Sequence, residues 1–235
     1  MKDWQKYLAE VFGTFILVFV GSLALVSVFK APDQGTSATE VIVAFAFGLG
    51  LLAGLYAFAE VSGGHFNPAV SLAMFLDRRL AAADLVSYWA SQIIGAVLAS
   101  LVILFAFTKQ DVANTATVHS STKVALVVEI SLTAIFVLVI LQVTKSGTYG
   151  ATALAAIPLT LVAIHFAAIP FSGASVNPAR SFAPALVGHQ WSGFWVYVVG
   201  PLSGAVIGWF VHAVVAKGAD FRGGAKAAPE AVSEA

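Results

Sequence analysis

Hydrophobic residues run along this chain in six long stretches, separated by connections that are richer in polar residues and glycine. They cover residues 7–29, 41–59, 82–107, 124–144, 151–171 and 194–216. Each stretch has about the 20 residues that a helix needs to cross a hydrocarbon core of about 30 Å. The pattern therefore predicts six transmembrane helices in an all-α integral membrane protein.

Two further apolar stretches, residues 67–76 and 177–186, are too short to span a bilayer. As helices they would be roughly 15 Å long, which is half a membrane. Each begins with Asn-Pro-Ala, at Asn67 and at Asn177. Asn is a favoured N-cap and Pro a favoured first helical residue, so the tripeptide is a compact helix start. The sequence predicts two half-helices, which re-enter the membrane, lie on its surface or belong to the core.

The two short stretches belong to an internal repeat. At the offset of the two Asn-Pro-Ala motifs, Ser71 matches Ser181. The similarity continues outward, because the segment that begins at Glu10 resembles the one that begins at Glu129. A coincidental motif would not bring its flanking residues with it, so we interpret the chain as two related halves.

Three of the predicted spans precede the connection at residues 108–123, and three follow it. Two halves with an odd number of spans insert in opposite orientations, which makes an inverted repeat. We expect a single membrane domain over residues 1–235, with the repeats at about 5–107 and 124–216.

Composition supports the membrane assignment and narrows the function. The chain is 59% hydrophobic and 10% charged, and no soluble domain of this length could hide that much apolar surface. The net charge of zero implies no nucleic-acid partner. The chain has no cysteine, which excludes disulfides and thiolate metal sites. We expect no cofactor and no metal.

The basic residues divide unevenly between the two predicted ends. One end holds Lys2, Lys6, Arg78, Arg79, Lys145, Lys217, Arg222 and Lys226, and the other holds Lys30, Lys109 and Lys123. The positive-inside rule therefore places both termini in the cytoplasm. Residues 218–235, rich in Ala, Gly and charge, are predicted to form a mobile cytoplasmic tail.

An inverted repeat would bring the two half-helix starts together near the bilayer centre. The side-chain oxygens of Asn67 and Asn177 can cap their own helices, which leaves each NH₂ group to donate into the space between them. Both helix N-termini point there, so the centre is electropositive. The sequence therefore predicts a polar site in the middle of the membrane.

The backbone before each Asn-Pro-Ala motif must be non-helical. Unpaired carbonyls survive in a membrane only when they are buried in protein or line a wet cavity. We predict a ladder of carbonyl acceptors for water at Gly63, Gly64, His65, Phe66, Gly173, Ala174, Ser175 and Val176. Ordinary interhelical turns are the alternative, but they would leave the duplication unexplained.

Together these motifs resemble the aquaporin (major intrinsic protein) family over about residues 5–216. The resemblance rests on both Asn-Pro-Ala motifs, the residues Ser62-Gly63-Gly64-His65-Phe66 before the first, Arg180-Ser181 after the second, and the pair Glu10 and Glu129. It implies six tilted helices and two re-entrant half-helices around one pore per subunit, in a homotetramer. It is similar in detail to the bacterial water channels, which implies a multi-pass protein of a bacterial-type plasma (inner) membrane.

The resemblance also implies a selectivity filter at Phe47, His165, Ala174 and Arg180. Water-selective members carry Phe and His at the first two positions, whereas glycerol facilitators typically carry Trp and a small residue. Ala174 departs from the Cys or Thr of many water channels. An Arg in a membrane segment is costly unless it faces a wet cavity or a partner, so Arg180 can donate to passing water and repel cations.

These residues predict a passive, water-selective channel that excludes protons and ions. A channel that also passes small neutral solutes (glycerol, ammonia or hydrogen peroxide) is the alternative. Its partners would be water, membrane lipid and other copies of the chain. We expect Glu10 and Glu129 to accept hydrogen bonds from the irregular loops, with a proton relay as the alternative role.

Three other classes of protein fit the sequence less well. A secondary transporter can also contain inverted repeats and broken helices, but beyond Glu10, Glu129 and Glu60 the spans offer almost no carboxylates for a coupling ion. A structural junction protein with a vestigial pore would not need intact filter residues. An enzyme is disfavoured, because the sequence offers no nucleophile–base pair, metal cluster or phosphate loop in a supporting context.

Overall fold

The structure is a computed structural model that describes residues 3–31, 37–116, 121–145 and 150–216. Six helices in this part of the chain are long and apolar enough to cross a membrane, which confirms the six predicted spans. They are α1 (Asp3–Lys30), α2 (Ser37–Ser62), α4 (Ala82–Ala106), α6 (Thr122–Val143), α7 (Ala151–Ser172) and α9 (Val196–Val211), which the π-helical turn η1 (His212–Ala216) continues. The predicted tail at 218–235 lies outside the described residues.

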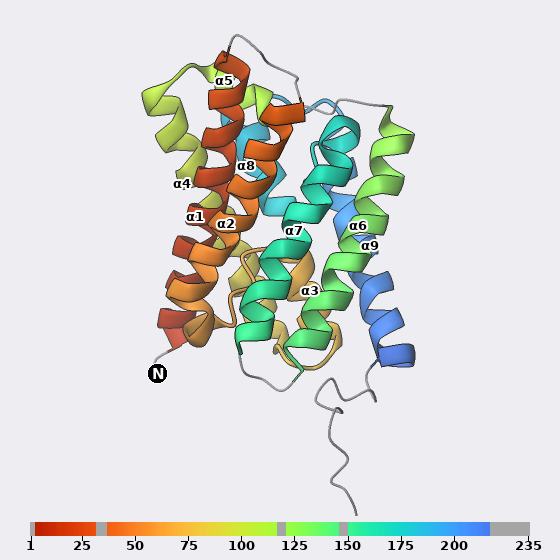
Figure 1. Ribbon diagram of the computed structural model, residues 1–235. Helices are drawn as coiled ribbons and strands as arrows, with labels where there is room; N and C mark the ends of the chain where they lie inside the picture. The colour runs from red at the N-terminus through yellow and green to blue at the C-terminus, as the bar shows by residue number, and fades with distance from the viewer. Residues whose placement is uncertain (1–2, 32–36, 117–120, 146–149, 217–235) are drawn as a thin grey trace, which may run out of the picture.

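Two short helices, α3 (Pro68–Leu76) and α8 (Pro178–Gly188), begin at the Asn-Pro-Ala motifs. They lie in opposite halves of the bundle, with α8 toward one end and α3 toward the other (Figure 1). Helix α8 runs two residues beyond the predicted end at residue 186. A third short helix, α5 (Lys109–Asn114), lies in the connection between the two halves and was not predicted.

The helix packing repeats between the two halves of the chain. Helix α1 packs against α2 and α4, and in the same way α6 packs against α7 and α9. Each half-helix also crosses to the other half, because α3 contacts α9 and α8 contacts α4. The N-terminus and the end of α9 lie at the same end of the bundle (Figure 1), as an even number of spans requires.

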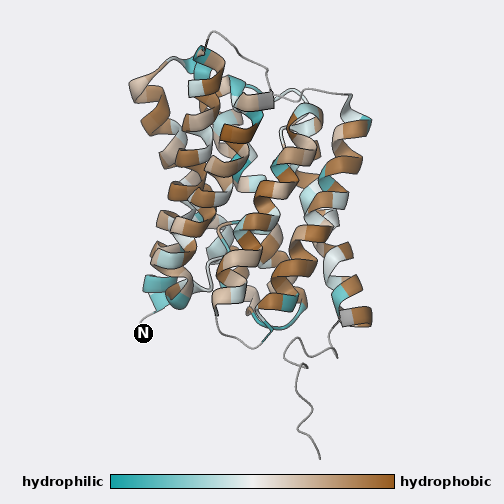
Figure 2. Ribbon diagram, in the orientation of Figure 1, coloured by the Kyte–Doolittle hydropathy of each residue, from teal (hydrophilic) through white to brown (hydrophobic). Residues whose placement is uncertain are grey.

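The long helices are hydrophobic over most of their length, and hydrophilic residues gather mainly toward the two ends of the bundle (Figure 2). Large hydrophobic side chains point outward, with Phe105 94% exposed and Tyr56 71% exposed. An apolar surface of this extent would be unfavourable in water and fits lipid. The chain is therefore a multi-pass integral membrane protein.

Glycines let the paired helices approach closely at equivalent places in the two halves. A Cβ atom on Gly95 of α4 would clash with the Val11 carbonyl oxygen of α1. A Cβ atom on Gly204 of α9 would lie 2.5 Å from the Ile130 carbonyl oxygen of α6. In both cases the obstacle is backbone, which cannot move aside like a flexible side chain.

We therefore expect Gly95→Ala and Gly204→Ala each to destabilise the folded protein by about 1–3 kcal/mol through overpacking. Gly150→Ala is the matched control, since nothing lies within 4 Å of its added Cβ. Thermal unfolding in detergent measures the effect. Equal midpoints for Gly95→Ala and Gly150→Ala would show that the α1–α4 contact is not tight.

Candidate pore

Asn67 and Asn177 each cap the half-helix that follows. The side-chain oxygen of Asn67 accepts from the Ala69 amide at 2.9 Å, and that of Asn177 accepts from Ala179 at 3.0 Å. Both residues have extended backbones, as expected of N-caps. Pro follows each Asn and occupies the first helical position, where its missing N–H costs nothing.

Each Asn also binds the loop of the opposite half. Nδ2 of Asn67 donates to the Val176 carbonyl at 2.8 Å, and Nδ2 of Asn177 donates to the Phe66 carbonyl at 2.9 Å. We expected the NH₂ group of each Asn to be free to donate into the space between the helices. The structure shows that one of its two N–H groups is already bonded to the opposite loop. The two bonds tie the half-helices to each other across the centre, and one N–H per Asn remains for another acceptor.

Glu10 accepts four hydrogen bonds and thereby holds the first non-helical loop. Its Oε1 accepts from the Ser62 hydroxyl at 2.7 Å and from the His65 amide at 2.9 Å. Its Oε2 accepts from the Phe66 amide and from Nε2 of Gln92, both at 2.7 Å. All four partners are donors, which suits an ionised carboxylate in a fixed position rather than a group that relays protons.

Glu129 does the same for the second loop. It accepts from the Ser172 hydroxyl at 2.7 Å, the Ser175 amide at 2.9 Å and the Val176 amide at 2.7 Å. The backbone that these bonds hold is strained, since Val176 has φ 44° and Ala174 has φ 51°. Left-handed residues other than Gly cost about 1–3 kcal/mol each, and the charge-assisted bonds offset that cost.

Two tyrosines that the sequence did not single out hold the last helical residue before each loop. The Tyr88 hydroxyl donates to the Ser62 carbonyl, and the Tyr197 hydroxyl donates to the Ser172 carbonyl, both at 2.6 Å. Tyr88 lies in α4 and Tyr197 in α9, so the two bonds occupy equivalent places in the repeat. The repeat could have indicated these tyrosines, because Tyr88 follows Ser62 and Tyr197 follows Ser172 at nearly equal spacing.

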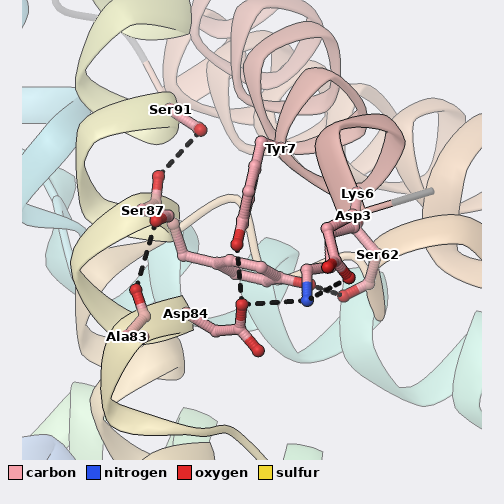
Figure 3. A network of polar contacts seen from close by, with 9 residues as sticks. Asp3, Lys6, Tyr7, Ser62, Ala83, Asp84, Ser87 and Ser91 are labelled. Carbon is pink, nitrogen blue, oxygen red and sulfur yellow. Dashed lines mark hydrogen bonds and ion pairs between the residues drawn. The ribbon is translucent and has the colours of Figure 1, made fainter.

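A polar network beside Ser62 joins α1 to α4 at the end of the bundle that holds the N-terminus (Figure 3). Asp84 of α4 accepts from the Tyr7 hydroxyl at 2.8 Å and pairs with Lys6 at 2.8 Å. Lys6 also pairs with Asp3 at 3.3 Å. The network ties α1 to α4 near the end of α2, from which the first loop continues.

Residues of both loops and three of the predicted filter residues surround a narrow cavity between the helices. Its lining includes Phe47, Gly64, His65, Asn67, His165, Ser175, Val176, Asn177 and Arg180, together with apolar side chains of α1, α2, α3, α6 and α7. About 20 Å³ of it is open to the centre of a water molecule. The cavity is therefore small and has room for water-sized groups only in a narrow space.

Four of the residues predicted to line the passage do not border this cavity, namely Gly63, Phe66, Gly173 and Ala174. The Phe66 ring packs instead against Gly13 and Gly54, where a Cβ would meet it. Ala174, predicted as a filter residue, is completely buried. Its backbone is left-handed, with φ 51°, and its place in the filter stays a prediction.

Phe47, His165 and Arg180 come together at one end of the cavity. The rings of Phe47 and His165 stack with centroids 4.5 Å apart, and the Arg180 guanidinium lies 4.9 Å from the Phe47 centroid. Nδ1 of His165 lies 2.9 Å from the Leu161 carbonyl. A carbonyl can only accept, so Nδ1 carries a proton, and Nε2 of the neutral ring is an acceptor.

Arg180 is held mainly by a carbonyl outside the repeated motifs. Its Nη1 donates to the Thr115 carbonyl at 2.9 Å, and its Nη2 lies 3.5 Å from the Gly173 carbonyl. Thr115 follows α5 in the connection between the halves. No sequence pattern pointed to this contact, because α5 itself was not predicted.

Glu129→Gln should destabilise the second loop, because an amide NH₂ would face N–H and O–H donors. We expect a loss of about 1–3 kcal/mol, measured by thermal unfolding, and a lower osmotic water permeability per folded protein. Glu60→Gln, at an exposed carboxylate, is the control and should change neither quantity. An unchanged midpoint for Glu129→Gln would contradict the role of the carboxylate in holding the loop.

Comparison with known proteins agrees with this geometry. The family model described as Major intrinsic protein matches residues 1–212. The chain is 39% identical to Aquaporin Z of Brucella melitensis, over 87% of this chain and 94% of that protein. It is 36% identical to the Glycerol uptake facilitator protein-like 6 of Lactiplantibacillus plantarum, over 90% and 98%. The aquaglyceroporin structure from Plasmodium falciparum superposes with a TM-score of 0.80 at 21% identity, over 91% and 97% of the two chains.

Proposed function

The chain belongs to the major intrinsic protein family, and from that premise we propose that it is a passive channel selective for water. The proteins of this family are channels, which confirms that the protein is not an enzyme. The observation that carries water selectivity is the meeting of Phe47, His165 and Arg180 in the lining of one small cavity.

The chemistry of this constriction favours water over polyols. Arg180 supplies donors, Nε2 of His165 supplies an acceptor, and Phe47 forms an apolar wall. A water can pair with the first two in turn. A polyol carries several hydroxyl groups, and those that face Phe47 would lose their hydrogen bonds, which is costly in a site without other partners.

Proton exclusion would arise at the two Asn residues. Each has one N–H left after the bond to the opposite loop, and both can donate to the same water oxygen. That water can then only donate outward, so the hydrogen-bond direction reverses at the centre. The two half-helix N-termini, each equivalent to roughly +0.5 charge, add an electropositive barrier.

Glycerol conduction is the second candidate, because a relative named as a glycerol uptake facilitator is 36% identical over 90% of the chain. Stopped-flow light scattering of proteoliposomes distinguishes the two. An impermeant osmolyte gradient measures water, and a glycerol gradient measures glycerol. We expect fast water flux with glycerol flux near that of empty liposomes. Glycerol permeation comparable with that of water would reject the proposal.

We also propose a homotetramer in a bacterial-type plasma membrane with both termini in the cytoplasm. The basic residues support the orientation, since Arg78 and Arg79 follow α3, Lys145 follows α6, and both helices end toward the end of the bundle that holds the N-terminus (Figure 1). A groove between α2 and α7, lined by large apolar side chains such as Phe45, Leu49 and Leu159, offers a surface for subunit packing. Native mass spectrometry and protease protection in oriented vesicles test the two points.

Replacing His165 with Ala and Arg180 with Val removes both polar groups of the constriction and much of its bulk. We expect the double variant to pass glycerol and urea at least about fivefold faster than the parent, since loss of the unpaired-hydroxyl penalty is worth about 1–3 kcal/mol. The same stopped-flow assay measures it, with Lys109→Gln as a surface control. Unchanged solute permeability would show that these residues do not form the filter.

A further inference from the structure

Helix α5 connects a surface ion pair to the filter arginine. Nζ of Lys30, at the end of α1, lies 3.0 Å from Oδ2 of Asp111 in the first turn of α5. Lys30 also lies over the Phe107 ring, with 5.7 Å from Nζ to the centroid. Figure 1 places α5 beside the end of α1, at the end of the bundle away from the N-terminus.

Asp111 is the residue on which the start of α5 depends. It closes a capping box, in which its Oδ2 accepts from the Thr108 amide at 3.0 Å while its own amide donates to the Thr108 hydroxyl at 3.2 Å. Partial burial would raise the pKa of Asp111, but the hydrogen bonds from Thr108 and Lys30 outweigh it and hold that pKa below its usual value. The carboxylate is therefore charged at neutral pH.

The other end of α5 holds Arg180. The Thr115 carbonyl accepts from Nη1 at 2.9 Å, while the guanidinium's other contact, to Gly173, is at 3.5 Å. A hydrogen bond weakens steeply with length, so the position of Arg180 depends chiefly on Thr115. The Thr115 hydroxyl in turn donates to the Val112 carbonyl at 2.8 Å, which makes Thr115 continuous with the helix.

We propose that Lys30 and Asp111 are positioning residues of the selectivity filter, which act through α5 and the Thr115 carbonyl on the guanidinium of Arg180. The inference rests on the proposed function, because it assigns selectivity to Arg180. Neither residue belongs to the repeated motifs or borders the cavity. Without the pair, α5 can shift slightly, and the Thr115 carbonyl that holds Arg180 beside Phe47 shifts with it.

The pair shares the task of fixing α5 with apolar contacts. Val112 packs with Val26 and Ile103, and a Cβ on Gly188 would lie 2.6 Å from the Cα of Ala113. The helix should therefore remain folded without the ion pair and lose only its exact register. A partly exposed ion pair supports an effect of roughly twofold to fivefold.

The experiment compares the glycerol-to-water permeability ratio of proteoliposomes across variants. Lys30→Gln and Asp111→Asn should each raise the ratio roughly twofold to fivefold. Lys30→Arg keeps the charge and should therefore leave the ratio at the value of the parent. Lys109→Gln is the matched control, because it removes an exposed lysine from the same helix. Thermal midpoints identify any variant that has lost stability.

A double-variant cycle with Arg180→Val decides whether the effect passes through the arginine. Lys30→Gln should raise the ratio in the parent and leave it unchanged in Arg180→Val. An equal rise in both backgrounds, or no rise in the parent, overturns the inference while leaving Arg180 as a filter residue. If Arg180→Val itself does not alter the ratio, the proposed filter fails, and the inference fails with it.

Discussion

The structure depends on one constraint: backbone inside a hydrocarbon layer must find hydrogen-bond partners within the protein. The two half-helices can start in mid-membrane only because the chain before each of them is paired without being helical. Glu10 and Glu129 provide that pairing, each through both carboxylate oxygens. A buried charge is expensive unless all its lone pairs are satisfied, so carboxylate and loop stabilise each other and neither is stable alone.

The two halves share this arrangement of half-helix, loop and supporting carboxylate, and they differ in the side chains that border the cavity. At the repeat offset, Arg180 of the second half corresponds to Val70 of the first, and both border the cavity. The same backbone therefore offers a cation toward one end of the passage and an apolar wall toward the other. The supporting arrangement occurs in both halves, whereas the arginine occurs in the second half only. Selectivity in the proposed channel follows from that asymmetry.

Much of the fold could be predicted because its signals are local or repeated. The spans follow from apolar length, and the half-helices follow from a cap residue and a proline that act on their own helix. The role of Glu10 and Glu129 in supporting the loops was open to prediction because an intramembrane carboxylate needs several donors, and irregular backbone supplies them.

The contacts that were missed all join segments far apart in the chain and carry no local pattern. Thr115 holds Arg180 through a backbone carbonyl, which any residue would supply, so its identity says nothing. Helix α5 has six residues, too few for a hydrophobic period to be visible. Ala174 was assigned to the filter through the family resemblance, which does not reveal that its backbone is left-handed.

The bonds between the halves also bear on how water would cross the centre. Had both N–H groups of each Asn been free, the amides could have rotated to follow a passing water. With Asn67 bound to Val176 and Asn177 bound to Phe66, and each side-chain oxygen capping its own helix, both amides are fixed in orientation. The remaining N–H groups are thus preorganised donors that need no rearrangement when a water arrives. Fixed donors lower the cost of stripping a water from its neighbours, while they impose one orientation on it. The same rigidity that would let single waters pass would therefore oppose the reorientation that proton transfer along the file requires.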